Sequence, residues 1–137
     1  MKKIRLEIIG ITQVEEREDT FILILEEEFG KRRLPIYVGK FEAQAIAIEI
    51  EKIVPTRPLT HDLFKLLSNY FNFNLKEVVI SEVINGRFLS TMIWTDGLND
   101  KEMEARPSDA IAIALRMNTP IYSYEEILNQ AGVFDVS

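Results

Sequence analysis

The chain has 137 residues, of which 47% are hydrophobic and 28% are charged. These values are typical of a globular protein rather than a disordered one, and the length suits one domain over residues 1–137. The sequence contains no cysteine, which excludes disulfides, thiolate zinc sites and a cysteine nucleophile. Acidic residues outnumber basic ones, 22 to 16, so the net charge of −6 argues against tight, nonspecific gripping of nucleic acid by a basic surface.

The N-terminus briefly resembles a signal peptide, because Lys2 and Lys3 precede an apolar stretch. Arg5 and Glu7 interrupt that stretch, and no small-residue cleavage site follows. The sequence also lacks a run of about 18 apolar residues that could span a bilayer. We therefore expect a cytoplasmic protein with no membrane partner.

Alternating apolar and polar residues predict three strands at the start of the chain, over residues 3–14, 20–27 and 32–38. Gly10 lies inside the first strand and is expected to mark a bulge. Because short polar turns separate the strands, they are predicted to form an antiparallel meander.

After Gly39 the apolar residues adopt helical spacing, which predicts a helix over residues 41–54. Phe41, Ala45 and Ile48 form a second apolar row, nearly opposite the stripe that would pack on the sheet. This row requires another partner, either a neighbouring helix or a second subunit. The second alternative indicates a homo-oligomer, with a dimer as the simplest form. The main stripe consists of Ala43, Ile46, Ala47, Ile50 and Ile53.

The second half begins with a predicted helix over residues 60–70, whose residues Leu63, Phe64, Leu66 and Leu67 are expected to face the core. Asn85-Gly86 predicts a tight hairpin turn between two strands. The remaining expected elements are strands at 75–84, 87–95 and 102–105, a helix at 108–117, an edge strand at 121–124 and a helix at 125–130.

The strands occur in runs rather than alternating with helices, which favours an α+β fold. We predict a mixed, largely antiparallel sheet, formed by the three-strand meander, the hairpin and the short strands, with about four helices packed on it.

Two similar segments precede predicted helices, Arg57-Pro58-Leu59-Thr60-His61-Asp62 and Arg106-Pro107-Ser108-Asp109-Ala110. We call them the first and second corner. Proline keeps the preceding residue extended, and Ser or Thr at a helix start can cap free N–H groups. Thr60 and Ser108 are therefore expected to cap helices. The only histidine of the chain, His61, lies at the first corner, so the two corners would form a site if they faced one cleft.

Several segments, in this order, resemble the bifunctional nuclease domain family, and the similarity covers roughly residues 5–133. The resemblance implies cleavage of DNA and RNA, with nucleic acid as the partner. We expect a bacterial single-domain member without the C-terminal module associated with excision-repair proteins. The matching segments are Leu34-Pro35-Ile36-Tyr37-Val38-Gly39, Glu42-Ala43-Gln44-Ala45-Ile46, the first corner, Asn85-Gly86-Arg87-Phe88, and the second corner with Ile111-Ala112.

Phosphodiester hydrolysis needs an activated water, stabilised phosphoryl oxygens and a proton for the leaving oxygen, often with metal ions held by carboxylates or histidine. The candidate catalytic residues are therefore His61, Asp62, Asp109 and Glu42. A divalent ion, Mg²⁺ or Mn²⁺, is one possible cofactor, with His61, Asp62 and Asp109 as candidate ligands. Because adjacent helical side chains diverge by about 100°, His61 and Asp62 need a third group, from Asp109, Glu42 or Glu104.

Helix starts and arginines both suit phosphate. Lys40, Arg57 and Arg106 each lie close to a predicted helix start, and they are the expected phosphate contacts together with Thr60 and Ser108. Alternatively, the two arginines are buried structural partners of Asp62 and Asp109.

The favoured function is a nuclease that hydrolyses DNA or RNA, or both, with metal assistance. A non-catalytic module that binds nucleic acid or another anionic ligand, and an oligomeric structural or regulatory protein, remain as alternatives. Among the aromatic residues, Trp94 and Phe88 are expected to pack in the core or an interface, and Tyr122 stays open as a residue that could stack on a base.

Overall fold

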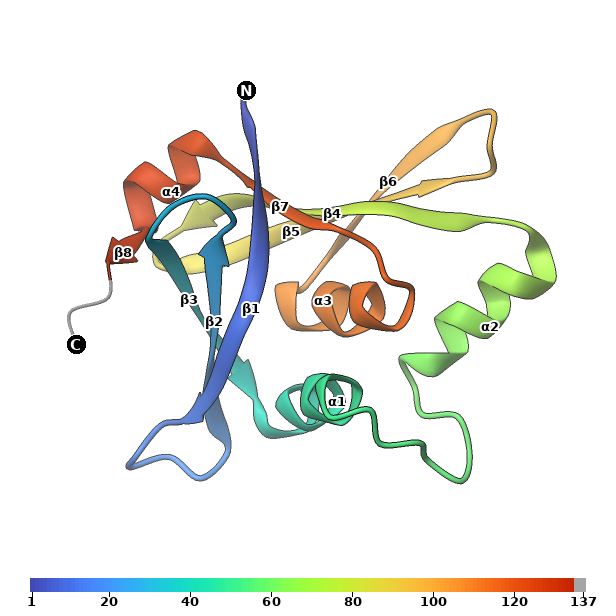
Figure 1. The fold of residues 1–137 in the computed structure, drawn as a ribbon, viewed down its shortest axis with the longest axis horizontal. Helices are drawn as coiled ribbons and strands as arrows, with labels where there is room; N and C mark the ends of the chain where they lie inside the picture. The colour runs from blue at the N-terminus through green and yellow to red at the C-terminus, as the bar shows by residue number, and fades with distance from the viewer. Residues whose placement is uncertain (135–137) are drawn as a thin grey trace.

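A computed structural model describes residues 1–134 of the chain, and these residues form an α+β fold with four helices and one eight-stranded sheet (Figure 1). The predicted fold class is confirmed. No helix among the described residues has the length and apolar character needed to cross a bilayer. The elements are β1 (Lys3–Gln13), β2 (Thr20–Glu27), β3 (Arg32–Gly39), α1 (Lys40–Ile50), α2 (Asp62–Phe71), β4 (Asn74–Ile84), β5 (Arg87–Thr95), β6 (Asp100–Ala105), α3 (Pro107–Arg116), β7 (Ile121–Tyr124), α4 (Glu125–Ala131) and β8 (Val133–Phe134).

The sheet has the strand order β6-β5-β4-β7-β1-β2-β3-β8. The meander β1–β3 and the β4–β5 hairpin are both antiparallel, as predicted. β7 lies between them, antiparallel to β1 and parallel to β4 (Figure 1). The prediction of an edge strand at 121–124 is therefore wrong, and the buried side chains of Ile121 and Ser123 agree with its interior position.

Two local predictions about the strands are confirmed. The register of β1 against β2 shifts between Ile8 and Gly10, which leaves Ile9 as the extra residue of a bulge. Asn85 and Gly86 form the hairpin turn with φ angles of 51° and 78°, and two positive φ angles fit the type I′ turns that join antiparallel strands.

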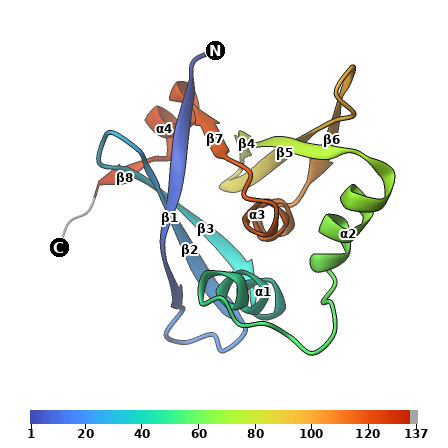
Figure 2. The same cartoon turned by 45° about the vertical axis from the view of Figure 1, so that its right-hand side comes forward.

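α1 and α3 lie side by side in both views, and α3 occupies the centre of the molecule (Figures 1 and 2). Within the second apolar row, Ala45 lies next to the neighbouring helix, since its side chain is buried and its carbonyl accepts a hydrogen bond from Arg116 of α3. Phe41 is different, since 78% of its surface is exposed. α1 also ends at Ile50, four residues before the predicted end at Val54.

The predicted orientation of the second helix is wrong. Leu63, Leu66 and Leu67 of α2 are 37–48% exposed, whereas Phe64 and Ser68 face the interior. Leu63, Leu66 and Leu67 lie on one side of the helix, at i, i+3 and i+4, and periodicity alone did not show that this side faces solvent while Phe64 packs inward. Trp94 is buried and Phe88 packs against the core, as expected.

Candidate functional site

The two corners are neighbours in the fold, as the site hypothesis requires. Nε2 of His61, just before α2, lies 2.9 Å from Oδ1 of Asp109 in the first turn of α3, although the two residues are 48 positions apart.

The hydrogen bonds continue from Asp109 to α1. Nε of Arg106 donates to Oδ2 of Asp109 at 3.0 Å, and Nη2 of Arg106 donates to Oε1 of Glu42 at 2.9 Å. We call Glu42, His61, Arg106 and Asp109 the corner cluster. It brings together groups from α1, the start of α2 and the start of α3, so its geometry depends on how the three helices pack.

The corner cluster opens into a solvent-accessible pocket of about 460 Å³. The Arg106 side chain is 66% exposed, and those of Asp109 and His61 are 32% and 14% exposed. One wall of the pocket is polar, and the other is formed by apolar residues of α1 and the first corner. The cluster can therefore meet a ligand from solvent. The apolar wall consists of Phe41, Ala45, Ile48 and Leu59.

Burial alone would raise the pKa of Asp109, but the hydrogen bonds from His61 and Arg106 and the Arg106 charge outweigh it, so the pKa is lowered. Asp109 and Glu42 in turn raise the pKa of Arg106. Asp109 is therefore a carboxylate that accepts a hydrogen bond from Nε2–H of His61. With the proton on Nε2, the Nδ1 atom carries none and is free to accept one. Nδ1 has no hydrogen-bond partner within residues 1–134.

Asp62, the fourth candidate catalytic residue, is held elsewhere. Its carboxylate accepts hydrogen bonds from Nε of Arg116 at 2.6 Å and from the Leu59 amide at 2.7 Å. Burial would raise the pKa of Asp62, but these two partners lower it. Asp62 therefore anchors the start of α2, and its carboxylate is not part of the corner cluster.

Arg116 was not among the predicted site residues, yet it positions the cluster. It is 3% exposed and also donates to the carbonyls of Ala112 in α3 and Ala45 in α1. By binding Asp62, the residue that follows His61, Arg116 links α1, α2 and α3. The available signal in the sequence is an arginine that closes an otherwise apolar helix, because such a residue needs buried acceptors.

The five predicted phosphate contacts are dispersed. Arg106 belongs to the corner cluster and Thr60 lines its pocket, whereas Ser108 lines the adjacent cavity. Arg57 and Lys40 are exposed, and neither forms a hydrogen bond or ion pair within residues 1–134. Arg106 is paired with Asp109, as the structural alternative expected, but it is not buried.

The predicted capping roles of Thr60 and Ser108 are wrong. Neither α2 nor α3 has a side-chain cap hydrogen bond. Pro107 occupies the first turn of α3, so the cap position falls on Arg106 and places Ser108 inside the helix. At the first corner, the Asp62 carboxylate reaches back to the Leu59 amide instead.

Among the described residues, no three His, Asp or Glu side chains lie close enough together to hold a metal ion. Both oxygens of Asp109 and one of Glu42 are bonded to His61 or Arg106, and Glu104 lies on β6 beside the adjacent cavity. This donor set, already paired with cationic or N–H groups, does not fit a divalent ion as it stands.

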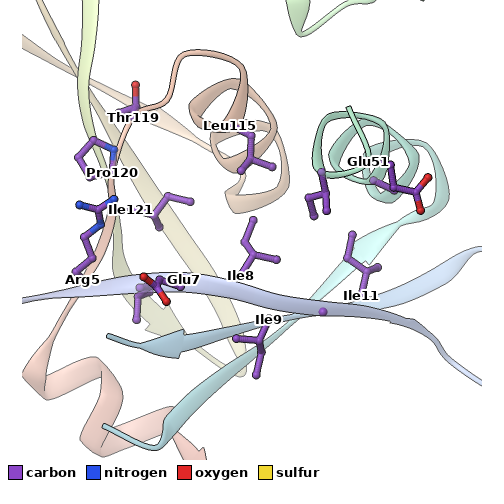
Figure 3. A pocket seen from close by; sticks show the side chains of 14 residues that line it. Arg5, Glu7, Ile8, Ile9, Ile11, Glu51, Leu115, Thr119, Pro120 and Ile121 are labelled. Carbon is purple, nitrogen blue, oxygen red and sulfur yellow. The ribbon is translucent and has the colours of Figure 1, made fainter. Parts of the chain in front are cut away.

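Another cavity, of about 540 Å³, lies between β1, the end of α1 and the segment from α3 to β7 (Figure 3). In Figure 3, Ile8, Leu115 and Ile121 line it from three different elements. Its lining is mainly aliphatic and shares no residue with the pocket of the corner cluster. It lacks the histidine and the paired carboxylate that acid–base chemistry would use.

Comparison with known proteins agrees with the resemblance found in the sequence. An uncharacterised protein of Mycobacterium tuberculosis is 43% identical over 126 residues, which are 92% of this chain and 74% of that protein, in both strain CDC 1551 and strain H37Rv. Bifunctional nuclease 2 of Oryza sativa subsp. japonica is 25% identical over 118 residues, which are 84% of this chain and 36% of the rice protein. The model of the bifunctional nuclease domain matches residues 23–135, and the chain therefore belongs to the bifunctional nuclease domain family.

Proposed function

We propose that this protein hydrolyses phosphodiester bonds of nucleic acid in the pocket of the corner cluster. The observation that carries the proposal is the His61–Asp109 hydrogen bond beside the exposed Arg106 guanidinium. A histidine oriented by a carboxylate, next to a cation, is suited to transferring a proton close to a phosphate. Membership of the family supports the same reaction class.

The residues have distinct roles in this hypothesis. In hydrolysis a water oxygen bonds to phosphorus, the ester P–O bond breaks, and the leaving oxygen takes a proton from solvent. Nδ1 of His61 accepts the proton of the attacking water, while Asp109 holds the imidazole in the required tautomer. Arg106 has one terminal nitrogen, Nη1, without a partner in residues 1–134, and this nitrogen can bind a phosphoryl oxygen.

A metal-assisted reaction remains a prediction from the sequence. Because the donors of the corner cluster are already paired, we assign no step to an ion. Cleavage measured in EDTA, and after Mg²⁺ or Mn²⁺ is added back, tests this prediction directly. Full activity in EDTA would contradict metal assistance and agree with acid–base chemistry by His61 alone.

The decisive test compares His61→Ala and Asp109→Asn with the unaltered protein on labelled DNA and RNA strands. Removing the proton-transfer group should lower the cleavage rate by at least about 100-fold. Asp109→Asn should lower the rate less, because the imidazole remains but loses its fixed tautomer. Lys76→Ala is the control, since Lys76 of β4 pairs with the exposed Asp100 of β6 and does not line the pocket of the corner cluster.

Each contrary outcome favours another function. A His61→Ala protein that cuts at the full rate would remove His61 from the mechanism and contradict the proposal. Salt-dependent binding of nucleic acid by a protein that never cuts would favour the non-catalytic binding module.

We also propose that the chain forms a homodimer. The supporting observation is the exposed apolar row on α2, formed by Leu63, Leu66, Leu67 and Tyr70 at i, i+3, i+4 and i+7. Covering this row with a second copy would remove it from water. Sedimentation equilibrium should give twice the chain mass, and Leu67→Glu should give a monomer. A monomer at every concentration of the unaltered protein would contradict a dimer.

A further inference from the structure

A second cavity lies beside the pocket of the corner cluster and shares Arg106 with it. This second cavity has a volume of about 680 Å³ and is lined by the end of β3, the β4–β5 turn and the second corner. Arg106 lines both cavities, and the chain passes directly from Gly39 in one to Phe41 in the other. The two cavities therefore adjoin at Arg106 and the start of α1, and we call them together the cluster groove.

Each cavity of the cluster groove has an exposed aromatic ring. Tyr37 of β3 is 67% exposed and lines one cavity, and Phe41 of α1 is 78% exposed and lines the other. Neither ring packs against the hydrophobic core, unlike Phe64, Phe73 and Phe88. Core packing therefore does not explain these two rings, and both are free to stack on a ligand.

The spacing of the two rings suits a chain of nucleotides. Tyr37 and Phe41 are four residues apart, so their Cα atoms can be separated by at most about 14 Å. Arg106 lies on the groove between the two cavities. A strand with bases on both rings would therefore pass Arg106, which lines both cavities.

The lining of the two cavities carries charges of both signs, with Arg87 and Arg106 among the carboxylates of Glu42, Glu104 and Asp109. Arg87 lines the cavity that contains Tyr37, and Lys40 lies between Gly39 and Phe41 in the chain. Both side chains lack an ion pair within residues 1–134. Two unpaired cations beside exposed aromatic rings are features of proteins that bind single-stranded nucleic acid.

We propose that the cluster groove binds single-stranded nucleic acid, with one unpaired base stacked on Phe41 and another on Tyr37. This inference rests on the proposed function for the position of the cleaved phosphate. In a duplex the faces of the bases are covered by their neighbours, so the two rings have nothing to stack on. The groove therefore selects single strands over duplexes of the same sequence.

Fluorescence anisotropy tests the inference with three probes: a labelled oligo(dT) strand, its duplex with oligo(dA), and a strand of equal length that carries abasic sites. Unaltered protein should bind the single strand more tightly than the duplex. Phe41→Ala and Tyr37→Ala should each weaken binding of oligo(dT) about tenfold and leave binding of the abasic strand unchanged. Phe41→Trp should retain the affinity.

Phe29→Ala is the matched control, because Phe29 is 94% exposed and lines neither cavity of the groove. Equal affinity for single strand and duplex, or unchanged oligo(dT) binding in both aromatic variants, would overturn the inference. Loss of abasic-strand binding in Phe41→Ala would overturn it too, since the ring would then act without a base.

The experiment separates the two proposals. A protein that binds oligo(dT) through Phe41 but never cuts supports the groove and contradicts the nuclease. A protein that cuts through His61 but binds duplex equally well supports the nuclease and contradicts the groove.

Discussion

The two corners share a sequence pattern but differ in how their charged groups are used. At the first corner Asp62 is bound by a buried arginine, Arg116, and Arg57 has no partner within residues 1–134. At the second corner Asp109 is bound by the exposed Arg106 and by His61. The first corner is thus an anchor that presents one functional side chain, and the second supplies the open charged groups.

The difference shows that the position of the partner decides the role of an aspartate at a helix start. A carboxylate paired with a buried guanidinium stabilises the fold, because separating them would leave a charge in the interior. A carboxylate paired at the surface remains accessible to ligands. The following substitutions test this distinction.

Replacing Arg116 should have the largest effect on stability. Arg116→Met leaves Asp62 and two helix carbonyls without their donor, so the free energy of unfolding should fall by about 3 kcal/mol. Urea unfolding followed by circular dichroism measures it. Lys76→Met is the control on an exposed pair, and it should hardly move the unfolding midpoint. A similar midpoint shift for both variants would contradict the anchor role of the first corner.

The two corner arginines should differ in catalysis. Arg106→Ala removes hydrogen bonds to both Asp109 and Glu42 and should lower kcat/KM for a single-stranded substrate about 30-fold. Arg57→Ala should change kcat/KM less than about twofold, because an exposed surface residue without partners contributes little. Equal losses in the two variants would show that both corners contact the substrate.

Gly39→Ala, a substitution next to the corner cluster, should disturb the contact between Glu42 and Arg106. A Cβ atom at residue 39 would lie 2.7 Å from Oε2 of Glu42, so the carboxylate must move away from its position on Arg106. Since this contact is an exposed ion pair, we expect kcat/KM to fall about threefold. Gly10→Ala is the matched control, because its Cβ would meet nothing within 4 Å. Unchanged kcat/KM in Gly39→Ala would show that Glu42 is dispensable.

The smallest expected effect is on how the stability of the fold changes as the pH falls. The folded-state pKa of Asp62 lies below its usual value of 3.8, so its contribution to stability is present above about pH 4 and is lost as the pH falls through the folded-state pKa. Asp62→Asn should therefore be less stable at neutral pH and lose less stability on acidification. Thermal melts from pH 7 to pH 2.5 measure the slope of stability against pH. Asp109→Asn should change the slope less, because Asp109 is more exposed. A larger change for Asp109 would contradict the distinction between anchor and site.

The sequence predicted the features that depend on neighbouring residues. The meander, the bulge at Gly10 and the turn at Asn85-Gly86 follow from local periodicity and from residues that tolerate unusual φ angles. The interior place of β7 and the outward face of α2 depend on pairing with distant segments. A four-residue strand fits an edge as well as a centre, and the leucine side of α2 could equally have packed on the core or faced solvent.

The same division applies to the candidate site. Proline and the helix starts indicated the corners, and His61 was prominent as the only histidine. The separation of Asp62 from Asp109 could not be predicted, because it depends on Arg116 reaching across from α3. Phe41 and Tyr37 were not proposed as stacking residues, since their exposure is a result of tertiary packing. Tyr122, the aromatic residue left open from the sequence, lies under the Lys3 ammonium, 5.6 Å from the ring centroid.

The central place of β7 has a consequence for synthesis on the ribosome. Ile121–Tyr124 joins the β1 side of the sheet to the β4 side, so the two sides cannot pair through it until most of the chain has been translated. Until then β1 and β4 each have an unpaired edge, which is a template for aggregation. A nascent chain stalled before residue 121 would therefore be the form most dependent on chaperones.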